Sequence, residues 1–495
     1  MPDIYKHGTY GEFAESIGGV ATQAGTIPVY IGTLPVNLIR GYDEAGIINA
    51  PVLLRTLTAA RQTVGYSADW SKFTLCEAIK AHFDNASGNV GPIVIINVLD
   101  PTTHKKAGEA TTEDLSFSNG RATIASDTII LDTLVLADKV EGVDFTVEYD
   151  YTNGLVMIGS IGAEQITGSV QATYNEVDPS LVTETQIIGG VTDAGAYTGL
   201  GAVALVYPEL NLIPNLIVAP GWSEKPAVYN AMVTTGTKIN GHWDAFILAD
   251  IPLAVAPSTK VDTIGAAIEW KETNGYNSER AKVCWPQAVG TDGNIYHTST
   301  LCAWRMLSVD ASHESVPMET PSNKSIPVLK QYFGDGSTNR GFDQTQGNTL
   351  NEQGITTLVF WGGLWVLWGG HTAAYKFGDV TDNRTVFDNS IRMMMYISNS
   401  FQQEHALTID QPMTRAMADT IRNREQEKAD ALAAIGALIG TPTVRFDETA
   451  NTTADMVEGN FTWDFEGTPT PQFKSGTMRV AYTDAGFDTY FGEVN

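Results

Sequence analysis

Basic residues and cysteines are scarce in this chain, and each scarcity excludes a class of function. The 495 residues include 30 lysines and arginines against 57 aspartates and glutamates, which gives a net charge of −27. Such a surface disfavours binding to nucleic-acid phosphates or anionic membranes, so neither partner is expected. The three cysteines, Cys76, Cys284 and Cys302, lack metal-site spacing and are too few for a disulfide framework. They are compatible with synthesis in a reducing compartment.

Long hydrophobic segments are also missing. The first residues, MPDIYKHGTY, have no apolar core, so no signal peptide is expected. The longest uncharged apolar run, from Gly354 to Gly370, is too short and too rich in glycine to span a bilayer. We therefore expect a soluble protein without direct membrane insertion.

The motifs of common catalytic and cofactor sites are absent as well. No GxxxxGK[ST] or GxGxxG lies between a strand and a helix, and no HExxH or GxSxG occurs. The oxygen ligands in 379–388 lack the twelve-residue calcium-loop pattern, so helix capping and solvation are the expected roles. Trp361, Trp365 and Trp368 could form a stacking platform, but interleaved glycines and aliphatic residues favour buried packing. The sequence predicts no catalytic residue, no cofactor and no metal.

An alternation of buried strands and amphipathic helices is present in two parts of the chain. Strand-like runs lie at 26–36, 92–99, 215–220, 243–251 and 281–286, and helix-like segments at 73–83, 225–239, 260–271 and 298–310. This alternation predicts an α/β core with a mostly parallel sheet covered by helices.

Between these two parts, residues 104–180 change to a period of two. Asn119-Gly120 and Asn153-Gly154 supply dipeptides that favour tight hairpin turns, and no helical pattern interrupts the strands. We expect an inserted all-β domain, sandwich-like in architecture.

The stretch from Gly354 to Gln403 predicts two short buried strands followed by a helix. Phe387, Ile391, Met394, Met395 and Ser398 fall at helical spacing and predict its apolar face. A second helix is expected from Asp410, as its N-cap, to Ile439, with Gly440, Thr441 and Pro442 ending it; strands at 443–448 and 460–467 follow. These segments predict an α+β C-terminal domain.

Both ends of the chain have strand-like patterns outside the folded body. Apolar residues alternate or cluster at Ile4, Tyr5, Tyr10 and Phe13 and again at Met478, Val480 and Tyr482. Such arms either fold back or add a strand to a sheet of another chain, and the residues alone favour neither.

Three segments resemble one known family, the tail sheath proteins of contractile phages and phage-tail-like bacteriocins. HGTYGEF with IPVYIGTLP resembles the family's N-terminal signature, and TGLGAVALVYPELNLIPNLIVAPGWS resembles the start of its core domain. WVLWGGHTA followed by FDNSIRMMMYISNS resembles the entry to its C-terminal domain. The resemblance covers about residues 1–60 and 195–490.

The resemblance implies a structural subunit rather than an enzyme. It implies self-assembly into stacked hexameric rings around an inner tail tube, with both arms exchanged as strands between neighbours. Baseplate and tail terminator proteins would be the other partners, and contraction would drive the tube through the target cell envelope. The implied location is the virion tail, assembled in the host cytoplasm. From the residues alone, an α/β enzyme with a β binding module and a static surface-layer protein remain alternatives.

The expected division of the chain follows from these patterns and the resemblance. The predicted parts are an N-terminal arm (1–25), an α/β core (26–103 and 185–380), an inserted β-sandwich domain (104–184), a C-terminal sheath domain (381–475) and a C-terminal arm (476–495).

The helix from Asp410 has a charge-balanced first half in a chain that is otherwise strongly acidic. One interpretation is a solvated face with (i, i+4) pairs such as Arg415–Asp419, each contributing about 0.3–0.5 kcal/mol. The other uses the resemblance, which implies that this domain grips the tube by charge. The candidate tube contacts are Arg415, Arg422, Arg424 and Lys428.

Overall fold

The computed structural model describes residues 25–337, 339, 341–379 and 382–492. Its centre is an eight-stranded mixed sheet in the order β2-β3-β1-β12-β13-β16-β20-β21. The strands are β1 (Pro28–Gly32), β2 (Pro51–Leu54), β3 (Ile93–Asn97), β12 (Leu216–Val218), β13 (Phe246–Asp250), β16 (Ala281–Cys284), β20 (Ile355–Trp361) and β21 (Leu364–Trp368).

The inner strands of this sheet are parallel, and the outermost pairs, β2–β3 and β20–β21, are antiparallel. β1, β3 and β13 are buried along their whole length, as expected for strands covered on both faces. The predicted strands of the α/β core are therefore confirmed.

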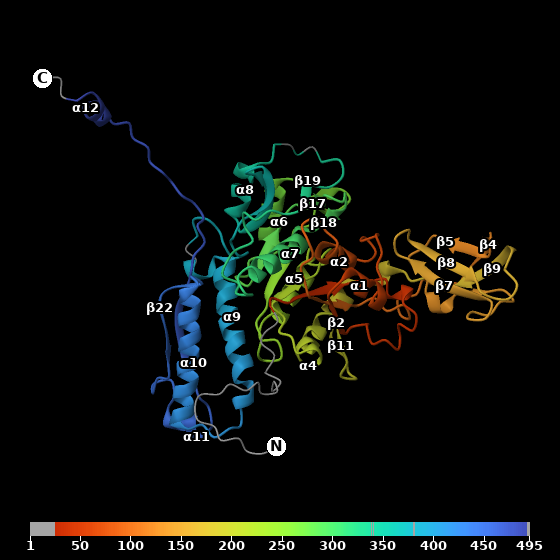
Figure 1. The fold of residues 1–495 in the computed structure, drawn as a ribbon, viewed down its shortest axis with the longest axis horizontal. Helices are drawn as coiled ribbons and strands as arrows, with labels where there is room; N and C mark the ends of the chain where they lie inside the picture. Colours follow the sequence, from red (N-terminus) through yellow and green to blue (C-terminus); the bar gives the residue numbers. More distant parts are fainter. Residues whose placement is uncertain (1–24, 338, 340, 380–381, 493–495) are drawn as a thin grey trace, which may run out of the picture.

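Helices surround the sheet (Figure 1), and four of them overlap the segments that the sequence predicts to be helical, 73–83, 225–239, 260–271 and 298–310. They are α1 (Leu57–Thr63), α2 (Leu75–Phe83), α3 (Glu184–Ile188), α4 (Val206–Leu210), α5 (Pro226–Thr235), α6 (Ile264–Thr273), α7 (Thr298–Ala311) and α8 (Gln344–Asn351). α6 begins later than expected because Thr259–Lys260 forms a strand and Thr263 caps the helix, accepting a hydrogen bond from Ala266 N.

Several small antiparallel sheets complete the body. They contain β10 (Gly190–Val191) with β11 (Tyr197–Thr198), β14 (Ala254–Ala256) with β15 (Thr259–Lys260), and β17 (Gln287–Gly290) between β18 (Ile295–Tyr296) and β19 (Val328–Tyr332).

Residues 104–180 form strands only in antiparallel sheets, as their period-two pattern predicts. One sheet has the order β4-β9-β6 and the other β5-β8-β7. The strands are β4 (Thr111–Phe117), β5 (Arg121–Ile124), β6 (Val135–Leu136), β7 (Phe145–Asp150), β8 (Leu155–Ser160) and β9 (Gly168–Tyr174). Asn119 and Gly120 both have positive φ, which a type I′ hairpin turn requires. The apolar side chains of these six strands form a cluster separate from that of the large sheet. Residues 104–180 lie at one end of the molecule (Figure 1).

At the other end, two long helices lie side by side with a two-stranded antiparallel sheet (Figure 1). The elements are α9 (Asp388–His405), α10 (Arg415–Ala434), β22 (Leu438–Arg445), α11 (Thr453–Val457), β23 (Asp464–Pro469) and the isolated α12 (Ala485–Phe491). None of the helices in the described ranges is both long enough and apolar enough to cross a membrane.

The predicted boundaries of the second long helix are wrong. Asp410 does not cap it: Asp410 has a φ of 65°, and the N-cap is Thr414, whose hydroxyl accepts a hydrogen bond from Met417 N at 3.2 Å. The helix ends at Ala434, and Gly436, with a φ of 81°, follows it. Gly440 and Pro442 instead lie within β22.

The predicted apolar face of α9 is also partly wrong. Met394 is 42% exposed. The side chains that α9 buries with Met393 and Met395 include the polar residues Arg392, Asn399 and Gln403. The helix packs against ion pairs and backbone groups as well as against apolar surface.

The expectation that the tryptophan-rich strands are fully buried is wrong at their tip. Phe360, Trp361 and Leu364 are 56%, 47% and 57% exposed. β16 pairs with only the first residues of β20, Ile355 and Thr356, so the rest of the hairpin extends past the neighbouring strand.

Candidate assembly surfaces

The described part of the C-terminal arm lies away from the folded body and ends in α12 (Figure 1). Met478, Val480 and Tyr482 are 84%, 82% and 84% exposed. Residues 470–483 contain no helix or strand in this single chain. These alternating apolar side chains, which the family resemblance implies pair in a neighbouring subunit, are thus uncovered here. The N-terminal candidates, Ile4, Tyr5, Tyr10 and Phe13, lie outside the described residues.

The root of this arm is held against the body. Thr470 N donates to Ala437 O at 3.0 Å, and Gln472 Nε2 donates to Gly370 O at 2.8 Å. A Cβ on residue 370 would lie 1.9 Å from Gln472 Oε1, so a larger residue there would displace the Gln472 amide from this position. Lys474 Nζ donates to the Tyr375 hydroxyl at 3.2 Å. The arm therefore leaves the body from a defined point beside a cleft of about 970 Å³.

His371 forms part of the same anchoring surface. Its ring stacks on that of Tyr375 with centroids 3.6 Å apart. Burial, with Lys474 and Lys282 nearby, lowers the pKa of His371 to about 3, so the ring is neutral at physiological pH.

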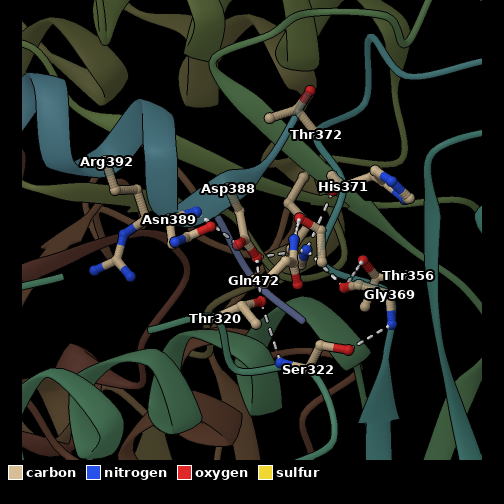
Figure 2. Close-up of polar contacts among 12 residues, drawn as sticks. Thr320, Ser322, Thr356, Gly369, His371, Thr372, Asp388, Asn389, Arg392 and Gln472 are labelled. Carbon is tan, nitrogen blue, oxygen red and sulfur yellow. Dashed lines mark hydrogen bonds and ion pairs between the residues drawn. The ribbon is translucent and has the colours of Figure 1, made fainter. Parts of the chain in front are cut away.

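A fully buried ion pair lies directly beneath this anchor. Lys282 Nζ, from β16, is 2.7 Å from Asp388 Oδ2, in the first turn of α9, and both side chains are 0% exposed. The ammonium also donates to Gly369 O at 2.9 Å and His371 O at 3.2 Å. Figure 2 shows Thr320 and Asp388 facing each other, and the Thr320 hydroxyl donates to the carboxylate at 3.0 Å. The charges are paired and hydrogen-bonded, as burial requires.

A second buried ion pair lies one turn further along α9. The guanidinium of Arg392 contacts both carboxylate oxygens of Asp310, at the end of α7. Thr26 Oγ1 donates to Asp310 Oδ2 at 2.5 Å. Together the two pairs fasten the first half of α9 to the large sheet and to α7. Sequence patterns missed these residues; the one available signal was Lys282 within an otherwise apolar strand.

The four candidate tube contacts lie on α10 and differ in how far their side chains are exposed. Arg415 and Arg424 have side chains 69% and 59% exposed, and Arg422 is 39% exposed. Arg415 Nε is 3.2 Å from Asp419 Oδ2, the (i, i+4) pair that the sequence predicts. Lys428 is the least exposed, since its ammonium lies 2.5 Å from Glu404 on α9 and 2.7 Å from Glu425.

A cluster of carboxylates around His297 is the strongest candidate for acid–base chemistry. His297 Nδ1 is 2.7 Å from Glu77 Oε2, and its Nε2 is 3.5 Å from Glu224 Oε1. Although burial opposes protonation, Glu77 and Glu224 raise the pKa of His297 well above its usual value. Burial raises the pKa of nearby Asp250 to about 7, while Ser299 donates to this carboxyl from its backbone N at 2.9 Å. The hydrogen bonds of His297 and Asp250 are made to partners on neighbouring elements and so link α2, β13 and α7. This arrangement fits a structural role.

In the described part of the chain, no group of three or more histidine, cysteine, aspartate or glutamate side chains is arranged to hold a metal ion. No protein-family model matches the sequence.

Individual relatives do match over long stretches. The tail sheath protein of Burkholderia phage BcepMu is 26% identical over 494 residues, which cover 95% of this chain and 97% of that protein. The tail sheath protein of Escherichia phage P2 is 24% identical over 306 residues, or 61% of this chain and 72% of that protein.

Solved structures show the same fold. The contracted helical sheath of the anti-feeding prophage superposes with a TM-score of 0.53 at 14% identity, covering 96% of this chain and 98% of that one. The contracted sheath complex of the extracellular contractile injection system PVC gives a TM-score of 0.53 at 11% identity, covering 98% and 100%. With full-length sequence similarity to a phage sheath protein and a matching fold, the chain belongs to the contractile tail sheath protein family.

Proposed function

We propose that this tail sheath subunit polymerises as stacked hexameric rings around an inner tube, and that its contraction drives the tube through the target cell envelope. In this proposal, the arms of each subunit pair as strands with sheets of its neighbours. The energy of contraction comes from new contacts between subunits, since rigid bodies move between two packings.

The observation that carries the proposal is the uncovered C-terminal arm. Met478, Val480 and Tyr482 are more than four-fifths exposed, and such an apolar edge is a liability unless another chain covers it. In the same chain, β22 and β23 form a sheet of only two strands, which is marginal by itself and can accept a further strand.

The buried ion pairs support movement of the subunit as one body. Lys282–Asp388 and Arg392–Asp310 join α9 to the α/β body with no solvent-exposed charge on the first pair. Removing either partner would leave an uncompensated buried charge, so the junction resists opening. The helical end would therefore follow the body when subunits change their packing.

For the domain division, we infer an α/β core at 26–103 and 185–380, a sandwich-like insert at 104–184, and an α+β sheath domain at 381–475. The separate apolar cluster of the insert supports the division between the insert and the α/β core. The two arms at 1–25 and 476–495 are the proposed connectors, and the inner tube, baseplate and tail terminator proteins are the proposed partners.

Electron microscopy of the purified full-length protein tests this function. We expect tubes or stacked rings in negative stain at high protein concentration. Discrete small particles under all conditions would contradict polymerisation and favour the alternative of an α/β enzyme with a binding module. Flat two-dimensional arrays would favour the static surface-layer alternative.

A further inference from the structure

The hairpin of β20 and β21 ends in an apolar tip that the rest of the described chain leaves exposed. Phe360, Trp361 and Leu364 are the exposed side chains, and Gly362 and Gly363, both with positive φ, form the turn between the strands. Because side chains alternate along a strand, Phe360 lies on one side of the hairpin, and the cross-strand pair of Trp361 and Leu364 lies on the other. The tip is therefore a wedge that is apolar on both sides.

This hairpin also carries no charge. No aspartate, glutamate, lysine or arginine occurs from Gly354 to Gly370, in a chain with a net charge of −27. Two copies of so acidic a chain repel each other where their carboxylates meet, and an uncharged surface avoids this repulsion. An exposed, neutral tip rich in aromatic residues has the composition found at the centre of protein–protein interfaces.

The cleft beside the root of the C-terminal arm offers a surface that suits such a tip. We call it the arm-root cleft; its volume is about 970 Å³, and its walls include residues of α8, the segment after β21 and residues 470–476. Phe377 and Phe473, on these walls, are 67% and 88% exposed, so part of the aromatic lining is uncovered in the single chain. Lys474 adds an ammonium group that can bind the face of an indole ring.

The hairpin does not place its tip in the cleft of its own chain. Trp368, at its base, lines the cleft, whereas Trp361 and Leu364 do not. In the register Trp368 lies opposite Thr357, four residues from Trp361, which is roughly 13 Å along a strand. A projection that fits a pocket elsewhere on the same chain joins copies head to tail, and such contacts can continue into a helical polymer.

We propose that the tip of the β20–β21 hairpin, Phe360 to Leu364, inserts into the arm-root cleft of a second copy of this chain. The inference rests on the proposed function, because it assumes that the copies polymerise. It adds a contact between folded bodies to the contacts made by the arms. The contact is small, so it depends on the arms to hold the copies close together.

Cysteine pairs test the contact in polymers of the full chain. Leu364→Cys, at the tip, is combined with Phe377→Cys, in the cleft, and in the matched control with Val255→Cys, which is exposed on β14. The native cysteines are buried and do not compete. A short bismaleimide should join tip and cleft of different subunits into a covalent ladder and should give none in the control. Covalent dimers from Leu364→Cys alone would show that two tips meet each other, which would overturn the proposal.

Polar substitutions at the tip measure what the contact contributes. Trp361→Ser with Leu364→Ser should raise the protein concentration needed for polymerisation by at least about tenfold, as expected for the loss of a buried aromatic anchor. Both side chains are exposed in the single chain, so circular dichroism and urea denaturation should match the wild type. Val140→Ser with Val143→Ser removes two exposed apolar side chains from the inserted segment and should leave polymerisation unchanged.

A substitution in the cleft completes the test. Phe377→Ser should also weaken polymerisation, and combining it with the tip variant should add little, because both changes remove the same contact. Additive losses would overturn the proposal. A wild-type chain that forms no polymers would overturn the proposed function together with this inference. If the wild type polymerises and the tip variant does so at the same concentration, only the tip-to-cleft contact is wrong.

Discussion

Lys282 shows most clearly how a single residue fastens two parts of this molecule. Its ammonium is fully buried and is neutralised by Asp388, from a helix more than a hundred residues later in the chain. Strand patterning predicts a strand at 281–286, of which 281–284 lie in the sheet as β16, but it says nothing about the partner of a lysine there. The partner depends on how α9 packs, and that is a property of the tertiary structure.

Replacing this lysine alone should be costly. Lys282→Met leaves Asp388 charged, buried and without its cation, so we expect the free energy of unfolding to fall by about 3–5 kcal/mol. The double variant Lys282→Met with Asp388→Leu should recover most of that loss, because both charges are gone. Urea denaturation measures both.

An exposed ion pair provides the control. Lys376 Nζ is 2.6 Å from Glu272 Oε1 with side chains 46% and 49% exposed, so Lys376→Met should cost less than about 1 kcal/mol. Equal losses in Lys282→Met and Lys376→Met would contradict the structural role of the buried pair.

The pKa of Asp250 predicts how the stability of the folded protein depends on pH. Its folded pKa is raised to about 7 by burial, above the value of an unfolded aspartate, so the folded state favours the protonated form. The stabilisation is complete below the unfolded pKa of about 4 and is lost as the pH rises through the folded pKa. Asp250→Asn should therefore reduce the loss of stability between pH 5 and pH 8 by about 2–3 kcal/mol. A pH profile of chemical denaturation identical to the wild type would show that Asp250 is not the responsible group.

At the scale of elements, the sequence predicts which segments are strands and helices better than it predicts where they end. The buried strands 93–97 and 246–250 and the helix ending at Phe83 are found within predicted segments, because their apolar periods are long and regular. The start of α10 was predicted at Asp410 because aspartate and proline are common there; Thr414 takes the cap instead, in a chain that turns at Asp410.

Only part of the candidate assembly surface could be predicted from the sequence. Alternation predicts Met478, Val480 and Tyr482, because a period of two is visible without a fold. Gln472 could not be found in this way, since it bonds to a backbone group of a distant segment, the carbonyl of Gly370. The exposed hairpin tip at Phe360 and Trp361 was missed because hydrophobicity alone does not show that a hairpin extends past its sheet.

The segment 104–180 should be removable as a unit. Its ends lie together, since Asp178 N donates to His104 O at 2.8 Å and Lys106 N donates to Glu176 O at 2.8 Å. Joining the flanks with a short Gly/Ser segment should leave a soluble chain whose circular dichroism retains the helical signal. Some stability is lost, because Asn37 Nδ2 donates to Asp127 O and Ile129 O across this boundary. Aggregation of every such chain would count against a separable unit.

At the scale of the whole molecule, the acidic net charge makes the basic residues of α10 unusual. In a single subunit Arg422 and Arg424 contact Asp419 and Glu404 only at 3.8 Å and 3.5 Å, so an acidic tube could compete for them. We propose that these weak, exposed and salt-screened contacts hold the inner tube, since such contacts can break during contraction.

Reversing these two charges should separate tube binding from polymerisation. Arg422→Glu with Arg424→Glu should abolish assembly on the inner tube while leaving tube-free sheath polymers. The same charge change at the exposed Lys105 and Lys139, in the inserted segment, is the control and should have no effect. Normal attachment of the α10 variant to the tube would leave α10 as an ordinary solvated helix.

The most direct measurement compares the full chain with one that ends after Gly476, at matched concentrations, by electron microscopy and light scattering. The shortened chain keeps the anchors at Gln472 and Lys474, so circular dichroism should show a folded protein. We expect tubes or stacked rings for the full chain and only single subunits for the shortened one. Normal sheaths from the chain ending at Gly476 would contradict the claim that donated C-terminal strands connect the subunits.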